Sequence, residues 1–294
     1  MDLKAAILQN GFVKIPNFIP AEEISQLRQL IRASMAVDSS FMVTGPSYKG
    51  KTQPNAACVM PDIDWIFYHP KILMLMRELL GTEEIMFTSH CDVHSRTLSG
   101  WHKDDGMNIM AGGYFESPTY DLDDCHVYKV AIYLQDHFHN LAGLRVKRNS
   151  HRIATLDQGE EVYLKTKAGD VIVFDVRLTH SGQTDVVPLP VINKPLNFCL
   201  RGTHKIFHTR MFNIALKNIY DSIAGDRMSI FFTFGLPNDY TVKFARNNMR
   251  RQLREVPTSP IYLPEALKQK LIENKVLLAE DYFSNLQPLE ARKR

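Results

Sequence analysis

The hydrophobic pattern of the first 80 residues predicts helices with one short strand between them. Residues 2–9 suit a short helix that ends at Asn10-Gly11, because glycine readily takes the left-handed conformation of a helix end. Residues 12–15 alternate as a strand does. After Pro20, apolar residues recur at the spacing of an amphipathic helix, and a further helix is expected over residues 71–80, ending at Gly81.

From Glu84 the pattern changes to a period of two, which is typical of strands. Further short strands are expected over residues 126–134, 144–147, 171–174 and 228–234, and helical patterning returns from Val242. This order predicts a mainly β fold with flanking helices and a double-stranded β-helix (jelly-roll, cupin-like) core. We expect one domain over residues 1–294, with a helical part over about 1–83, the core over about 84–240 and C-terminal helices over about 241–294.

Composition narrows the class of protein. Apolar residues make up 45% of the 294 positions, yet no apolar run is long enough to span a membrane, and no secretion signal is visible at the N-terminus. A cytoplasmic protein with reduced, structural cysteines is therefore expected. The net charge of +3 is too small to indicate nucleic-acid binding. Four arginines near the C-terminus have roughly helical spacing and are interpreted as a solvated helix face (Arg246, Arg250, Arg251, Arg254).

Two His-x-Asp tripeptides offer candidate metal ligands, and their context separates them. His90 and Asp92 lie within a continuous alternating strand. His102 and Asp104 follow a turn and precede the flexible Asp105-Gly106, a position suited to ligands at the mouth of a β core. The tripeptide alone is weak evidence, because such motifs recur by chance.

His180, near the end of a later apolar strand, strengthens the His102-x-Asp104 candidate, since a β core could bring these strands together. Two imidazoles and one carboxylate form the ligand set of a non-haem Fe(II) site, which leaves one face of the metal open. Arg227 opens the strand over 228–234, where its guanidinium could hold a carboxylate, and Ser229 points the same way.

With these motifs in place, the chain resembles the phytanoyl-CoA dioxygenase-like branch of the Fe(II)/2-oxoglutarate oxygenases over roughly residues 8–240. The resemblance includes Asn10-Gly11-Phe12-Val13 and the helix opening at Pro20. It continues through Trp101-His102-Lys103-Asp104, Gly143-Leu144-Arg145-Val146, Asn149-Ser150-His151-Arg152, Gly169-Asp170, His180 and Arg227. Asn149 stands where the family usually has glycine, a minor departure because asparagine tolerates the left-handed conformation.

The resemblance implies that His102, Asp104 and His180 ligate Fe(II). It also implies that Arg227, with Ser229, binds the cosubstrate 2-oxoglutarate, which O2 converts to succinate and CO2 as a substrate C–H bond is oxidised. Lys129 is a weaker cosubstrate-binding candidate, because it lies on one face of the strand expected over residues 126–134. One departure is large: 46 residues separate His180 from Arg227, where the family has about ten. Arg201 and Arg210 lie within this insert as rival candidates, and Arg227 is preferred because it opens a strong apolar strand.

The insert over residues 183–226 is basic and interleaved with aromatic residues. We interpret it as a lid-like element that favours an anionic substrate through Arg201 and Lys205, or alternatively as a surface or dimer contact. His90, Asp92 and His94 line the pocket if their strand face points inward, and they are solvated if it points outward. Asp105 either orients the substrate or caps a turn.

The leading hypothesis is therefore an Fe(II)/2-oxoglutarate hydroxylase or related oxidase acting on a small molecule, as a monomer or homodimer without nucleic-acid or membrane partners. Halogenation is disfavoured because Asp104 fills the position that halide needs. Two alternatives stay open: a non-catalytic β-barrel binding module of the same fold, and a divalent-metal hydrolase that uses the same ligands.

Overall fold

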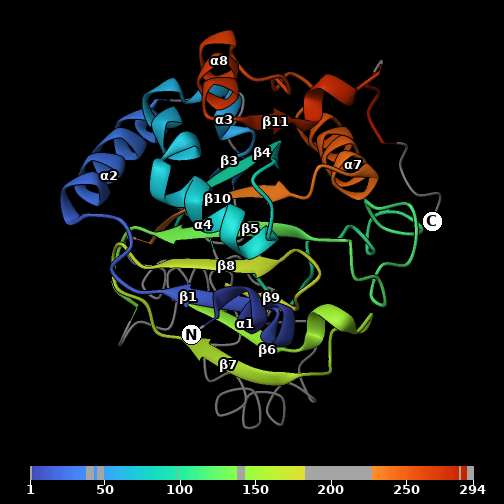
Figure 1. The fold of residues 1–294 in the computed structure, drawn as a ribbon. Coiled ribbons are helices and arrows are strands. Elements are labelled where there is room, and N and C mark those ends of the chain that lie inside the picture. Colours follow the sequence, from blue (N-terminus) through green and yellow to red (C-terminus); the bar gives the residue numbers. More distant parts are fainter. Residues whose placement is uncertain are drawn as a thin grey trace, which may run out of the picture.

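Two β-sheets form the centre of the molecule (Figure 1). The computed structural model describes residues 2–37, 43–44, 50–97, 99–137, 143–182, 227–284 and 286–289. The large sheet has the order β1 (Phe12–Ile15), β8 (Val171–Asp175), β5 (Val127–Tyr133), β10 (Met228–Gly235), β4 (Ile85–Ser95), β3 (Lys51–Gln53) and β2 (Val43–Thr44), with β11 (Val276–Leu278) parallel to β4. The small sheet has the order β7 (Glu160–Leu164), β6 (Leu144–Arg148) and β9 (His180–Ser181).

The two sheets pack face to face through a shared apolar layer. Ala131, Tyr133 and Phe174 of the large sheet are buried together with Leu144 and Val146 of the small sheet. From β5 onward the chain passes back and forth between the sheets, with β5, β8 and β10 in the large sheet and β6, β7 and β9 in the small one. This is the course of a jelly roll, so the predicted fold class is confirmed. Within the described residues the two sheets stay separate and do not close into a barrel.

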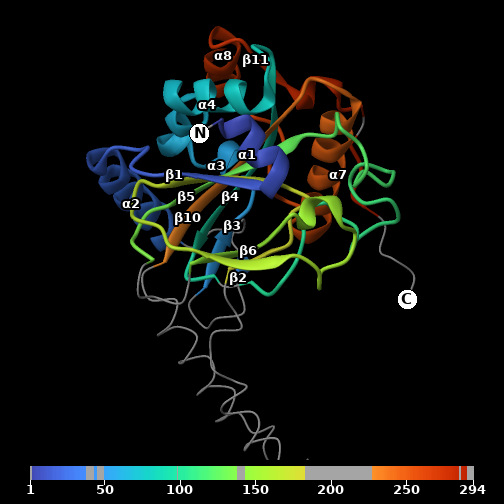
Figure 2. The same cartoon turned by 60° about the horizontal axis from the view of Figure 1, so that its bottom comes forward.

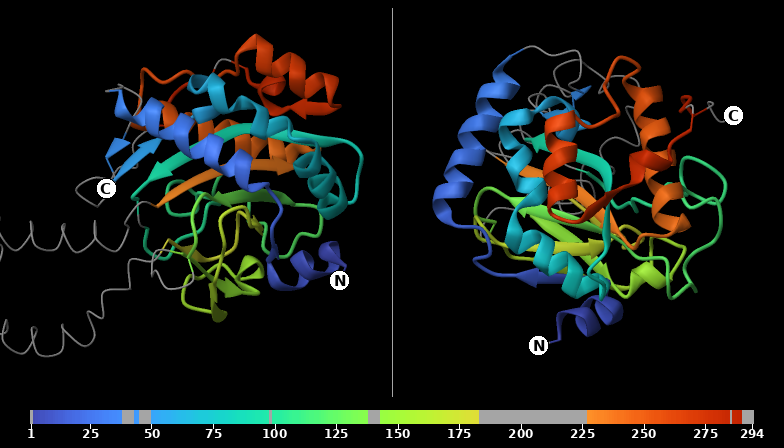
Figure 3. Two further views of the ribbon diagram at one scale, coloured as in Figure 1. Left: turned by 90° about the vertical axis from the view of Figure 1, so that its left-hand side faces the viewer. Right: turned by 45° about the horizontal axis from the view of Figure 1, so that its top comes forward.

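Helices cover the outer face of the large sheet, while the small sheet lies on its other side (Figure 3). None of the helices in the described ranges is long and apolar enough to cross a membrane. The helical elements are α1 (Leu3–Asn10), α2 (Ala21–Ala36), α3 (Ala56–Val59), η1 (Pro61–Tyr68), α4 (Pro70–Leu80), η2 (Ser150–Arg152), α7 (Asp239–Glu255), α8 (Glu265–Glu273) and η3 (Ala279–Tyr282).

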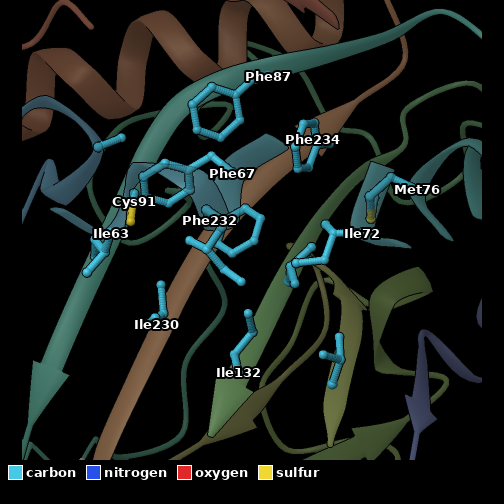
Figure 4. Packing of buried hydrophobic residues seen from close by; sticks show 14 of the residues in the cluster. Ile63, Phe67, Ile72, Met76, Phe87, Cys91, Ile132, Ile230, Phe232 and Phe234 are labelled. Atoms are coloured by element: carbon cyan, nitrogen blue, oxygen red, sulfur yellow. The ribbon is translucent and has the colours of Figure 1, made fainter. Parts of the chain in front are cut away.

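Aromatic side chains fill the core between these helices and the large sheet (Figure 4). Phe67 of η1 meets Phe232 of β10 edge to face, with ring centroids 5.3 Å apart, and Phe87 of β4 packs against Phe234 at 5.2 Å. Cys91 and Val93 lie on this same side, as the alternation of β4 predicts. His90, Asp92 and His94 of β4 therefore face the space between the two sheets.

The elements expected in the first 80 residues form with small shifts of their ends. α1 and α4 each end at a glycine in the left-handed conformation, Gly11 at φ +84° and Gly81 at φ +70°. The expected boundary at residue 83 needs a correction, because β1 and β3 belong to the large sheet. Both strands pair with edges that the core strands leave open, β1 with β8 and β3 with β4.

Candidate metal centre

Backbone pairing brings His102 beside His180, although they lie far apart in the sequence. Each residue donates its backbone N–H to the carbonyl of the other at 2.9 Å, which adds the His102 segment to the edge of the small sheet at β9. The backbone N–H of Asp104 donates to the carbonyl of Val176 at 2.8 Å, on the link between β8 and β9. The sheet itself therefore determines how the three side chains meet.

The three side chains converge as a ligand set. Their candidate ligand atoms all lie within 4.8 Å of one another. His102 Nε2 is 3.8 Å from one carboxylate oxygen of Asp104, and His180 Nε2 is 3.3 Å from the other. Exposure is graded, since the side chain of His180 is 7% exposed and that of His102 is 35% exposed. The site therefore opens to solvent on the His102 side.

Hydrogen bonds on the far side of each ring orient the imidazoles. His102 Nδ1 donates to the carbonyl of Gly100 at 2.7 Å, and His180 Nδ1 donates to that of Leu178 at 2.9 Å. This tautomer leaves the Nε2 lone pair of each ring facing the carboxylate of Asp104. Lone pairs and a carboxylate repel one another unless a cation lies between them, so the residues fit a metal ion. Burial, together with the neighbouring His180, lowers the pKa of His102 to about 4, which keeps its ring neutral.

Lys129 of β5 supports the carboxylate. Its ammonium donates to Asp104 Oδ2 at 2.6 Å, and its side chain is 8% exposed. Burial alone would raise the pKa of Asp104, but Lys129, His180 and His102 hold that pKa well below its usual range. Asp104 is therefore ionised, as a metal ligand must be.

The turn at Asn149-Ser150-His151 supports the segment that carries His180. Asn149 takes the left-handed conformation at φ +67°, as expected for a glycine position. Ser150 Oγ accepts the backbone N–H of Thr179 at 2.8 Å, and the carbonyl of Ser150 accepts the Lys103 ammonium at 2.6 Å. The turn thus joins both ligand-bearing segments, a structural reason for the motif.

A cavity of about 360 Å³ extends from the three ligands between the sheets. Arg227 lines it, 4% exposed, with its guanidinium 5.5 Å from the ring centroid of Tyr133 and bonded to the carbonyl of Thr97. Ser229 lies two residues further along β10, fully buried, and its hydroxyl has no hydrogen-bond partner among the described residues. A carboxylate held by Arg227 would give that hydroxyl a partner.

The polar face of β4 points into the cavity, where His90, Asp92 and His94 line the wall. His90 Nε2 lies 3.1 Å from Asp92 Oδ2, and His94 Nδ1 lies 2.9 Å from Thr52 Oγ1. Burial lowers the pKa of His94 to about 4. Asp105 turns away: its carboxylate accepts the backbone N–H of Met107 at 3.1 Å and the Tyr120 hydroxyl. We therefore assign it to the turn.

One wall of the cavity was not predicted from the sequence. α7 contributes Asn248, Arg251 and Glu255 to the lining, so the interpretation of Arg251 as part of a solvated helix face is wrong. The polar spacing of α7 carries no signal of this, because only the packing of α7 across β4 shows which arginine faces inward. The insert, with Arg201, Lys205 and Arg210, lies outside the described residues.

Fold and site together define a jelly-roll protein with a facial His/His/carboxylate metal centre, the arrangement of non-haem Fe(II) oxygenases. The sequence model of the phytanoyl-CoA dioxygenase family matches residues 7–185. This chain therefore belongs to the phytanoyl-CoA dioxygenase family, whose enzymes use Fe(II), 2-oxoglutarate and O2. A search of curated proteins finds no match.

Several solved structures share the fold at low sequence identity. SnoN, a non-haem α-ketoglutarate-dependent epimerase from nogalamycin biosynthesis, is 16% identical with a TM-score of 0.53, over 79% of this chain and 80% of that one. EctD from S. alaskensis, solved with 2-oxoglutarate and 5-hydroxyectoine, is 16% identical with a TM-score of 0.52, over 79% and 74%. AviO1 from Streptomyces viridochromogenes is 15% identical with a TM-score of 0.51, over 80% and 95%.

Proposed function

We propose that this protein is an Fe(II)- and 2-oxoglutarate-dependent oxygenase that oxidises a C–H bond of a small molecule, with hydroxylation as the reaction and succinate and CO2 as coproducts. The convergence of His102, Asp104 and His180 in one cavity carries this proposal. The cavity is of a size that suits a small molecule rather than a polymer.

Each residue around the centre has a distinct task. The Nε2 atoms of His102 and His180 and the carboxylate of Asp104 would hold Fe(II), which, with 2-oxoglutarate and O2, supplies the oxidising chemistry. Lys129 keeps Asp104 ionised and fixes its orientation. Arg227 would bind the distal carboxylate of 2-oxoglutarate with its planar fork of donors, assisted by Ser229.

The walls position the substrate and limit water access. Phe231 of β10 and Leu144 of β6 line the cavity beside the polar face of β4, so apolar and hydrogen-bonding surfaces both face the reacting region. We assign His90, Asp92 and His94 to substrate contact. Because Asp104 supplies the carboxylate ligand, hydroxylation fits this centre better than halogenation does.

The test is anaerobic reconstitution with Fe(II) and 2-oxoglutarate. We expect a weak visible charge-transfer band in the wild type and in His69→Ala, a histidine that pairs with Glu23 outside the cavity. His102→Ala and His180→Ala should lose the band while keeping the wild-type circular dichroism spectrum. A folded wild type without the band would contradict the proposal and favour the hydrolase. A band without any succinate release in air would favour the non-catalytic binding module.

A further inference from the structure

The wall formed by α7 is polar, although the proposed function assigns no role to its side chains. α7 lies across one end of the two sheets (Figure 2), and Gln252 on its inner side donates to Asp92 of β4 at 3.3 Å. From this helix Asn248, Arg251 and Glu255 reach the cavity that also holds the three metal ligands. The metal centre and α7 therefore face the same cavity.

Arg251 has part of its donor set engaged and part unused. Nη1 donates to Glu255 Oε2 at 2.7 Å, and Nη2 makes a long contact of 3.5 Å with Asn248 Oδ1. Nε is buried and has no hydrogen-bond partner among the described residues. Nε and Nη2 form the edge of a guanidinium that binds a carboxylate or phosphate through two parallel hydrogen bonds. A buried N–H without a partner is costly, so an acceptor on a bound ligand would stabilise this arginine.

Two neutral donors line the same cavity as Arg251. Asn248 is 3% exposed, and because its side-chain oxygen faces Arg251, its amide nitrogen is left available to the cavity. Tyr114 is also 3% exposed, and its side chain lines the cavity while its ring packs edge to face on Phe244 of α7. Asp92, a carboxylate of β4 in the same cavity lining, already has both oxygens engaged, by His90 and Gln252.

The other cationic side chains of the cavity lining already have acceptors. Lys129 pairs with Asp104, and the Lys103 ammonium donates to the carbonyls of Ser150 and Arg177. Arg227 is bonded to the carbonyl of Thr97 and is assigned to 2-oxoglutarate. Glu255 is about half exposed, so it offsets the charge of Arg251 from the solvent side only in part.

We propose that Arg251, with Asn248 and Tyr114, binds an oxyanion group of the substrate, either a carboxylate or a phosphate monoester. The inference rests on the proposed function, because it takes the same cavity as the substrate site. It makes Arg251 a specificity-determining residue: it binds one end of the substrate while the bond to be oxidised faces the metal centre.

The test uses the anaerobic protein loaded with Fe(II) and 2-oxoglutarate, titrated with matched probes. Hexanoate is compared with hexanamide, benzoate with benzamide, and phenyl phosphate with phenol. Binding is scored as a shift of the visible charge-transfer band at retained intensity, because loss of the band marks displacement of 2-oxoglutarate. At least one oxyanion should bind roughly tenfold or more tightly than its neutral partner, the scale of a charge-assisted hydrogen bond. The carboxylate and phosphate arms identify which oxyanion is preferred.

Variants separate recognition from folding. Arg251→Gln should abolish the preference for the oxyanion, and Glu255→Gln should strengthen it, because the competing carboxylate is removed. A purely structural ion pair would not give these opposite effects. Arg254→Gln, on the same helix but outside the cavity lining, should match the wild type.

Three results would overturn the inference: no oxyanion preferred in the wild type, displacement of 2-oxoglutarate alone, or an unchanged preference in Arg251→Gln. Failure of the band to form in the wild type would instead overturn the proposed function.

Discussion

The buried pair of Asp175 and Arg177 allows a quantitative test of how the metal centre is supported. Arg177 Nε donates to Asp175 Oδ1 at 2.9 Å and Nη2 donates to Oδ2 at 2.7 Å, while the backbone N–H of Arg177 donates to Oδ1 at 2.8 Å. The side chain of Arg177 is 3% exposed and that of Asp175 is 2% exposed. This pair shapes the link between β8 and His180. The perturbation is Asp175→Asn, which keeps the side-chain volume and removes the charge.

The expected loss of stability follows from burial. Removing one partner of a buried ion pair leaves an uncompensated charge and costs about 3–5 kcal/mol. For a chain of this length the midpoint of thermal unfolding should fall by roughly 6–10 °C. The matched control is Glu160→Gln, which breaks the exposed pair of Arg148 and Glu160 at 2.8 Å. Its cost should stay below about 1 kcal/mol, because water screens both groups.

The pH dependence gives a second, independent readout. Burial alone would raise the pKa of Asp175, but the Arg177 guanidinium holds that pKa below its usual range. A carboxyl whose folded-state pKa is depressed contributes stability above the unfolded value of about 3.9, and this contribution is lost as pH falls towards the folded-state pKa. The difference in unfolding free energy between wild type and Asp175→Asn should therefore be full at pH 6 to 7 and shrink below about pH 4.

Urea unfolding of both proteins across this pH range measures the difference directly. A loss below about 1 kcal/mol at neutral pH, or a difference independent of pH, would refute the reasoning. Because Leu178, whose carbonyl orients the His180 ring, lies in the same link, Fe(II) affinity should also fall, by about tenfold.

Three further predictions concern the metal, the cosubstrate and the core. Lys129→Met removes the donor that orients Asp104, so Fe(II) affinity measured against a competing chelator should fall roughly tenfold to a hundredfold, while the exposed Lys165→Met should match the wild type. Arg227→Gln should raise KM for 2-oxoglutarate about tenfold or more, with partial rescue in Arg227→Lys, and an unchanged KM would exclude Arg227 as the carboxylate ligand. Phe232→Ala should cost about 3–5 kcal/mol in urea unfolding because the ring is fully buried against Phe67, whereas the exposed Tyr282→Ala should change stability by less than about 0.5 kcal/mol.

Local patterns in the sequence predicted the elements whose burial repeats regularly. The alternation of β4 separates Cys91 and Val93 from His90 and Asp92 but leaves open which face points inward. The structure places Cys91 and Val93 in the helix-covered core and the other two residues in the cavity lining. The sequence could not show that β1 and β3 extend the large sheet, because joining an open edge depends on where distant strands end. β7 was missed for a different reason: only Leu164 of its five residues is buried, so the strand has no regular alternation.

The ligand set could be read from the sequence because the backbone determines its geometry. His102 and His180 face each other through reciprocal hydrogen bonds between their segments, so residue type and strand position were enough to make them candidates. The residues of α7 that line the cavity could not be predicted in this way. Arg246 and Arg251 lie on the same helix with similar spacing, yet one pairs with Glu116 outside the cavity lining and the other reaches the cavity. Only the packing angle of α7 on β4 separates them, and that angle depends on contacts such as the one between Gln252 and Asp92.

The metal ligands are positioned by backbone pairing and the α7 side chains by helix packing, and this difference affects substrate choice. The metal centre is built on paired backbone and on the turn at Ser150, so substitutions in the helices leave the ligands in place. The α7 side chains depend on helix packing alone, and a change there alters which donors reach the cavity without disturbing iron binding. Specificity and iron binding should therefore separate in mutants: Arg251→Gln should change the substrates that are accepted at an unchanged uncoupled rate of succinate release, whereas Asp175→Asn should reduce turnover of every substrate alike.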